Sequence, residues 1–134
     1  MKSNFKEKDF QSMWTKWVKK NAFASFPYEL KISKGRTVAF SKFEDQQLPA
    51  LQKASENIFH FKLTDASLGL KPFDGFVFKR TDAYVGIMFE TKKQQDICYF
   101  LHISYVMALK EAGAKSIKLK DCEECGLRIN LRDI

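Results

Sequence analysis

Apolar residues recur every three or four positions through residues 5–22, which predicts a helix with one apolar stripe. A second helix is predicted at about residues 42–56. There Ser41 and Glu44 have the spacing of a capping box, and Pro49 either kinks the helix or lies in its first turn. A third apolar segment ends at Gly113 and predicts a helix over residues 104–112. The stripe of the first helix consists of Phe10, Met13, Trp14, Trp17 and Val18.

The segments between these helices alternate or are continuously apolar, which predicts strands. Lys34-Gly35 predicts a hairpin turn between the first two strands. Helices and strands interleave without an internal repeat or linker, so we expect one α+β domain over residues 1–134. Its central sheet is expected to be mixed or antiparallel and flanked by helices. The predicted strands are residues 27–33, 37–40, 57–63, 73–78, 84–89 and 97–101.

Two of these strands carry an acid and a lysine two positions apart. Because residues i and i+2 of a strand share a face, Glu29 lies beside Lys31, and Glu90 lies beside Lys92. Both pairs occur as often as chance predicts, and an ordinary exposed charged pair is the alternative for each. Between them in the chain lies Asp74, among apolar neighbours where an aspartate is uncommon without a partner or a function.

An aspartate with a Glu-x-Lys pair is suited to Mg²⁺-dependent (or Mn²⁺-dependent) phosphodiester hydrolysis. Mg²⁺ prefers one or two carboxylates together with water and phosphate oxygens, and the lysine can position the attacking water. Asp74 can combine with Glu29 and Lys31 or with Glu90 and Lys92, and the strand pattern does not separate the two possibilities.

The charge favours a polyanion as partner. The 134 residues carry a net charge of +7, which suits nucleic acid or an anionic membrane, although a solvated lysine-rich surface is the alternative. The 13 phenylalanines supply aromatic bulk for a core and for a stacking surface. No apolar run approaches the length of a membrane span, and the N-terminus does not resemble a signal peptide. The candidate DNA contacts are Lys16, Lys19, Lys20, Lys34 and Arg36.

The cysteines and histidines predict little chemistry of their own. Three cysteines, an odd number, argue against a secreted disulfide framework, so we expect a reducing, cytoplasmic setting. Cys122-x-x-Cys125 is half of a zinc site, to which Cys98 and His102 could add ligands, but no spacing indicates that they do. His60 and His102 lie in apolar contexts and are predicted to be structural.

Several pieces of the chain, in order and over roughly residues 26–90, resemble phage and bacterial Holliday-junction-resolvase-like proteins of the PD-(D/E)xK nuclease superfamily. The resemblance implies a restriction-endonuclease-like fold, branched DNA as substrate and a homodimer. The pieces are Phe26-Pro27-Tyr28-Glu29-Leu30-Lys31, Phe40-Ser41, Gln47 with Leu51, and Phe61-Lys62-Leu63-Thr64-Asp65-Ala66-Ser67-Leu68-Gly69-Leu70-Lys71-Pro72-Phe73-Asp74.

The resemblance also implies roles for individual residues. Glu29 and Asp74 would bind the metal, Lys31 would position water or stabilise developing charge, and Gln47 would orient the lysine, water or phosphate. In the family the aspartate usually precedes Glu-x-Lys, so Asp74 implies a circularly permuted active site. The first helix is expected to add an acid, for which Glu7 is the candidate.

The leading hypothesis is therefore an intracellular, Mg²⁺-dependent DNA endonuclease of phage or bacterial DNA recombination. One alternative is a non-catalytic nucleic-acid-binding module that keeps the nuclease-like fold. Another is a structural partner subunit that uses its aromatic surface for protein contacts.

Overall fold

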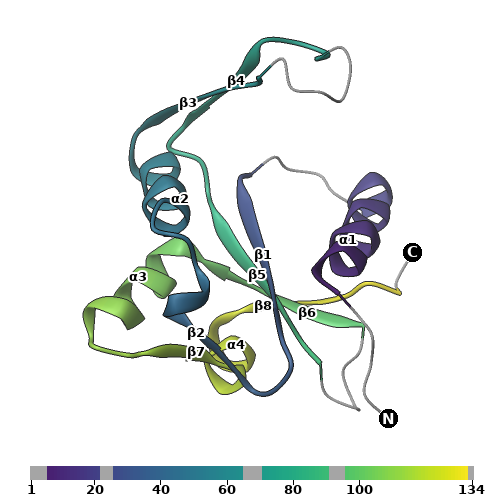
Figure 1. Ribbon diagram of the computed structural model, residues 1–134, viewed down its shortest axis with the longest axis vertical. Coiled ribbons are helices and arrows are strands. Elements are labelled where there is room, and N and C mark those ends of the chain that lie inside the picture. Colours follow the sequence, from purple (N-terminus) through teal and green to yellow (C-terminus); the bar gives the residue numbers. More distant parts are fainter. Residues whose placement is uncertain (1–5, 22–25, 65–70, 91–95, 133–134) are drawn as a thin grey trace.

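A four-stranded mixed sheet forms the centre of the molecule, in a computed structural model that describes residues 6–21, 26–64, 71–90 and 96–132. The strand order is β1 (Tyr28–Ser33), β5 (Tyr84–Phe89), β6 (Ile97–His102) and β8 (Leu127–Asn130). β1 and β5 are parallel, whereas β6 is antiparallel to both β5 and β8. The chain is an α+β protein, as the sequence predicts (Figure 1).

Helices cover both faces of this sheet (Figure 1). On one face, α1 (Glu7–Asn21) buries Phe10 and Trp14 against Leu30, Met88 and Phe100 of the sheet. The apolar stripe of α1 therefore packs on the sheet, while its lysines remain at the surface.

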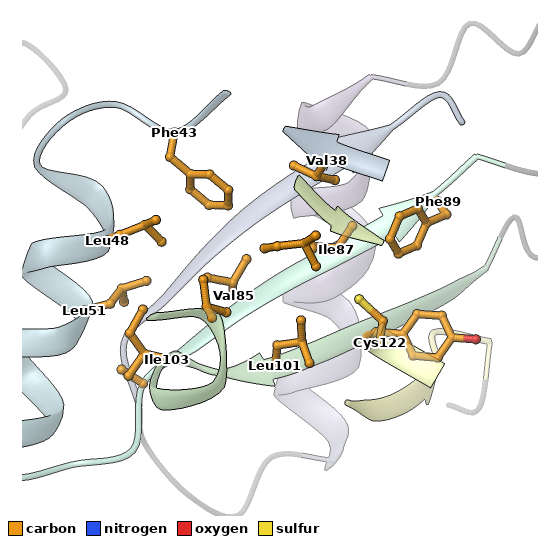
Figure 2. Close-up of a cluster of buried hydrophobic side chains, with 14 of the residues drawn as sticks. Val38, Phe43, Leu48, Leu51, Val85, Ile87, Phe89, Leu101, Ile103 and Cys122 are labelled. Carbon is orange, nitrogen blue, oxygen red and sulfur yellow. The ribbon is translucent and has the colours of Figure 1, made fainter. Parts of the chain in front are cut away.

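The other face of the sheet carries the larger core (Figure 2). There α2 (Gln47–Glu56) contributes Leu48 and Leu51, and α3 (Ile103–Glu111) contributes Ile103 and Val106. Because both faces are covered, β5 is buried along nearly its whole length and has a continuously apolar sequence.

Two small antiparallel pairs complete the described fold. β2 (Thr37–Ala39) pairs with β7 (Ser116–Lys118), which leads into α4 (Leu119–Cys125). β3 (Ile58–Lys62) pairs with β4 (Gly75–Lys79) in a hairpin that extends away from the central sheet, at the end where β1 begins (Figure 1). This hairpin, and not the central sheet, holds the segment around Asp74.

The second helix differs in detail from the sequence prediction. A 3₁₀ turn, η1 (Phe40–Lys42), precedes it, and α2 begins only at Gln47, with Pro49 in its first turn. The predicted capping box does not form, since the N-cap of α2 is Gln46, which makes no side-chain capping bond. The backbone N–H of Glu44 is instead bound by the Gln47 side chain.

The cysteines separate into two buried thiols and one exposed thiol. Burial raises the pKa of Cys98 to about 12. Burial also raises the pKa of Cys122 to about 12, and neighbouring acids add to the effect. Within the described residues, no group of three or more His, Cys, Asp or Glu side chains could hold a metal ion. The Cys122-x-x-Cys125 pair therefore has no zinc site there, because Cys122 points into the core.

We expect one cysteine of the three to react with a thiol reagent in the folded protein. Thiolates are the reactive species, and Cys98 and Cys122 are both buried and held protonated. Titration with an aromatic disulfide should label Cys125 quickly and the other two only after unfolding. The matched control, Cys125→Ser, should show no fast phase. Two fast thiols in the folded wild type would contradict this placement.

Candidate active site

Glu29 and Lys31 lie side by side near the start of β1, on the face of the strand predicted from their spacing. Lys31 Nζ is 3.4 Å from Glu29 Oε1, and the two side chains are only 13% and 25% exposed. Lys31 Nζ also lies 5.3 Å from the centre of the Phe43 ring, which belongs to the core beneath it. The pair is therefore more enclosed than an ordinary surface ion pair.

Gln47 completes this cluster from the first residue of α2. Its Nε2 donates a hydrogen bond of 2.9 Å to Glu29 Oε1, and its Oε1 accepts the backbone N–H of Glu44 at 2.9 Å. The second bond fixes the amide orientation, so that the N–H₂ group faces Glu29. Because α2 begins only at Gln47, the Gln47 side chain is in contact with Glu29 of β1.

Burial raises the pKa of the Glu29 carboxyl above its ordinary value, and the charges of Glu7 and Glu44 raise it further. Lys31 opposes this effect through its charge and its hydrogen bond. Burial is the larger influence because the carboxylate loses hydration that one lysine does not replace. An additional cation beside Glu29 would therefore be favourable, as expected of a metal ligand or a phosphate-site acid.

Replacing Glu29 with glutamine is expected to help stability more at pH 7 than at pH 4. A raised folded-state pKa stabilises the fold below the unfolded pKa, and this stabilisation is lost as the pH rises through the folded pKa. Glutamine has no such titration and can still accept the bond from Gln47. The melting temperature of Glu29→Gln minus that of wild type should increase from pH 4 to 7. Glu111→Gln, an exposed acid on α3, is the reference, and an unchanged difference would contradict the prediction.

Asp74 does not join Glu29 in this arrangement. It precedes β4 at the far end of the β3–β4 hairpin, where its backbone oxygen accepts the N–H of Leu63. Its side chain is 99% exposed and lies 3.6 Å from Lys71. The hairpin that Asp74 precedes is not part of the central sheet, so the described contacts do not join Asp74 to Glu29, and the metal pair Glu29 and Asp74 stays a prediction.

The alternative pair is also separate from Glu29. Glu90 follows the last residue of β5, and its backbone N–H bonds to Ser33 at the end of β1. Val85 lies opposite Glu29 on the neighbouring strand. At 3.3 Å per residue, the distance along the strand from Val85 to Glu90 is about 16 Å. Glu90 Oε1 is buried without a hydrogen-bond partner in the described part of the chain. Lys92 lies outside the described residues.

The predicted DNA contacts divide between two regions. Lys16, Lys19 and Lys20 are exposed on α1, whose last turn leads toward the start of β1. Lys34 and Arg36 are exposed in the turn after β1, at its opposite end. The α1 lysines are thus nearer the end of β1 that carries Glu29, although α1 packs on the Leu30 face of the sheet and the Glu29–Lys31 pair lies on the opposite face.

A cavity of about 240 Å³ lies between α1 and the start of β1, lined by Gln11, Thr15, Tyr28, Glu29 and Leu30. Glu7 precedes Gln11 by one helical turn and is close enough to affect the pKa of Glu29. The acid expected from the first helix is therefore near the cluster.

Sequence reasoning missed a second polar cluster, in which His102 is the N-cap of α3. Its Nδ1 accepts the backbone N–H of Ser104 at 3.1 Å and lies 2.8 Å from Ser104 Oγ, while Nε2 lies 3.1 Å from Asp82. The bond from Ser104 gives a partner to a backbone N–H group in the first turn of α3, which is a structural role. A histidine between a strand and a helix, followed by serine two positions on, is the signal that could have indicated it.

The cluster fits a metal such as Mg²⁺ only in part. Glu29 can serve as one carboxylate, since both of its described contacts are made by Oε1. Within the described residues Glu29 belongs to no group of three or more potential metal ligands, although Glu7 and Glu44 are close enough to raise its pKa. Mg²⁺ can be held by one carboxylate with water and substrate phosphate. Glu29 would then be the first protein ligand, and Glu7 or Glu44 is near enough to contribute a second carboxylate.

Comparisons with protein-family models, with curated proteins and with solved structures find no match. Within the described residues, no helix is long and apolar enough to cross a membrane. Any function must accordingly be argued from the geometry of the site itself.

Proposed function

We propose that this protein is a Mg²⁺-dependent DNA endonuclease that acts on branched DNA. The observation that carries the proposal is the hydrogen-bonded cluster of Glu29, Lys31 and Gln47, brought together from β1 and α2. An acid, a lysine and an amide that converge in a partly enclosed site beside a cavity suit phosphodiester hydrolysis. The net charge of +7 supports DNA as the partner.

A restriction-endonuclease-like fold is part of the proposal. In support of it, the strand with Glu-x-Lys is followed by the glutamine-bearing helix and then by a parallel neighbouring strand, β5. This crossover resembles the expected order of strand, helix and site residues. A homodimer would present two such sites to the arms of a junction.

Each member of the cluster has a distinct role. Glu29 would hold Mg²⁺, which when bound supplies charge stabilisation at the scissile phosphate. Lys31, held over Phe43 beside Glu29, would position the attacking water or stabilise the charge that develops on phosphate oxygens. Gln47 holds the Glu29 carboxylate in place and, through Glu44, keeps its own orientation.

The identity of a second carboxylate distinguishes two versions of the proposal. In the circularly permuted version Asp74 supplies it, which requires the β3–β4 hairpin to approach β1 when DNA binds. In the other version Glu7, already within electrostatic range of Glu29, supplies it. Cleavage that is lost in Asp74→Asn and kept in Glu7→Gln would support the permuted version, and the reverse result would support Glu7.

The direct test is cleavage of a labelled immobile four-way junction, with linear duplex of the same sequence as control. We expect cleavage with Mg²⁺ or Mn²⁺, none with EDTA, and none by Glu29→Gln. Glu111→Gln should cut as the wild type does. Salt-dependent binding of the junction without cleavage, in the presence of Mg²⁺ or of Mn²⁺, would contradict the proposed endonuclease activity.

That last outcome would support a second candidate function, a non-catalytic nucleic-acid-binding module. The observation that favours it is that the described residues form no group of three or more potential metal ligands, and that the Asp74 side chain pairs with Lys71 at the surface.

A further inference from the structure

A broad aromatic groove lies between the β3–β4 hairpin and the body of the molecule. It has a volume of about 960 Å³, and its walls come from α1, the start of β1, the hairpin and strands of the central sheet. Among its lining residues are Trp17, Tyr28, Phe61, Phe76, Phe78 and Leu127. A groove of this size is large enough to bind a ligand, and its apolar, aromatic lining is typical of ligand sites.

The hairpin presents one aromatic face to this groove. Phe59 is opposite Phe78, and Phe61 is opposite Phe76, so all four rings lie on the same side of the two strands. Phe61 and Phe76 nevertheless remain 51% and 41% exposed. An isolated two-stranded hairpin is marginally stable in water, so this exposed aromatic face indicates a surface that is covered when a ligand binds.

The charge around the groove selects the kind of ligand. Exposed cations lie near the groove after β4 and in the last turn of α1: Arg80, Lys19 and Lys20. Lys62 and Lys79 are also exposed, but they lie on the opposite face of the hairpin with Val77. The lining acid, Asp82, lies next to His102. A second copy of this chain bound face to face at this groove would bring the same exposed cations together, which is unfavourable at this surface. A polyanion with apolar flat rings, by contrast, satisfies both the cations and the aromatic walls.

The groove also adjoins the small cavity that contains Glu29. Tyr28 lines both the groove and the small cavity that contains Glu29, and its side chain is 45% exposed. A DNA strand with a phosphate at Glu29 would therefore pass Tyr28 and bring its neighbouring nucleotides to the groove.

We propose that this groove binds unpaired bases of single-stranded DNA, which stack on its aromatic side chains next to the scissile phosphate. The placement beside the scissile phosphate rests on the proposed endonuclease function, whereas the stacking does not. Stacking on aromatic side chains with lysines along the backbone is the usual means by which single strands are bound without sequence readout. The proposal deepens the function by making a branched substrate with unpaired bases the preferred one.

The test uses the two tryptophans, which are the only ones in the chain and both line the groove. Titration with a 15-nucleotide oligothymidylate in EDTA should quench their fluorescence, and anisotropy of the labelled oligonucleotide should give its affinity. Phe61→Leu and Phe76→Leu keep apolar bulk but lose the ring, and each should weaken binding about five-fold or more. Val77→Ala, on the opposite face of the hairpin and 66% exposed, is the matched control.

Unchanged oligothymidylate affinity in both phenylalanine variants would overturn the proposal. A dimer that dissociates in the same variants, detected by light scattering, would assign the groove to a second copy of the chain and would also overturn it. The two proposals fail separately. Junction cleavage without fluorescence quenching would contradict only the proposal that the groove binds single strands. Quenching without cleavage would contradict only the proposed endonuclease function.

Discussion

Lys31→Met is expected to slow junction cleavage by about 10²–10³-fold, the loss typical of removing one group that stabilises transition-state charge. Methionine keeps the apolar contact with Phe43 but has no charge, so the fold should persist while the ammonium beside Glu29 is lost. Single-turnover cleavage rates with saturating protein measure the chemical step, and junction affinity in EDTA should stay near the wild-type value.

Lys92→Met is the control for this prediction, because it makes the same substitution in the other Glu-x-Lys pair. Normal cleavage by Lys92→Met and inactive Lys31→Met would locate the site at Glu29. The opposite result would move the site to Glu90, whose buried Oε1 lacks a partner among the described residues. Cleavage rates equal to the wild-type rate in both variants would show that neither Lys31 nor Lys92 contributes to the chemical step.

Local patterns in the sequence predicted most elements of this fold but not how they assemble. The stripe of α1 and the two faces of β1 depend on neighbours along the chain. The stripe is confirmed, and in β1 Leu30 and Ile32 share one core while Lys31 lies over Phe43 of the other, although Tyr28 is exposed. The alternating segment at residues 73–78 also forms a strand, β4, yet it pairs with β3 outside the central sheet. Alternation shows that a strand has two faces but does not show which sheet it joins, so the position of Asp74 could not be predicted.

Near the C-terminus the sequence carried too little pattern to predict the elements. β7 is three residues long with only Ile117 buried, and α4 is seven residues long with only Cys122 buried. Such short elements hold fewer than two periods of strand or helix, which is too little for an apolar pattern to repeat, and their structure depends on the core they contact. The spacing of Cys122 and Cys125 alone does not indicate that Cys122 packs in the core.

Within the candidate site, the part made by one strand and the helix after it was predictable. Glu29 and Lys31 share a face because of their spacing, and Gln47 meets them because α2 follows β1 and β2 closely. The aromatic groove was not predictable, because its walls come from α1, the hairpin and the central sheet. The apolar stripe of α1 was assigned to the core, and Trp17 both extends that core and faces the groove.

Gly86→Ala is expected to lower the free energy of unfolding by about 1–3 kcal/mol, the usual result of overpacking a well-packed core. Gly86 lies in β5 between Leu30 of β1 and Phe100 of β6. A Cβ atom there would be 2.6 Å from Phe100 Cζ and 2.8 Å from Leu30 Cδ2. Phe100 cannot easily withdraw, since Trp14 stacks on it with ring centres 4.4 Å apart. Urea unfolding followed by circular dichroism measures the loss.

Gly35→Ala is the matched control, because an added Cβ would meet nothing within 4 Å in the turn after β1. Its stability should stay within about 0.5 kcal/mol of wild type. Combining Gly86→Ala with Phe100→Leu makes room for the methyl group, so the double variant should lose less than the sum of the single losses. Because Leu30 separates Glu29 from Lys31 on β1, strain at Gly86 should also slow junction cleavage, whereas Gly35→Ala should not. Equal stability of the two alanine variants would contradict the close packing that holds β1, and with it the candidate site, against the sheet.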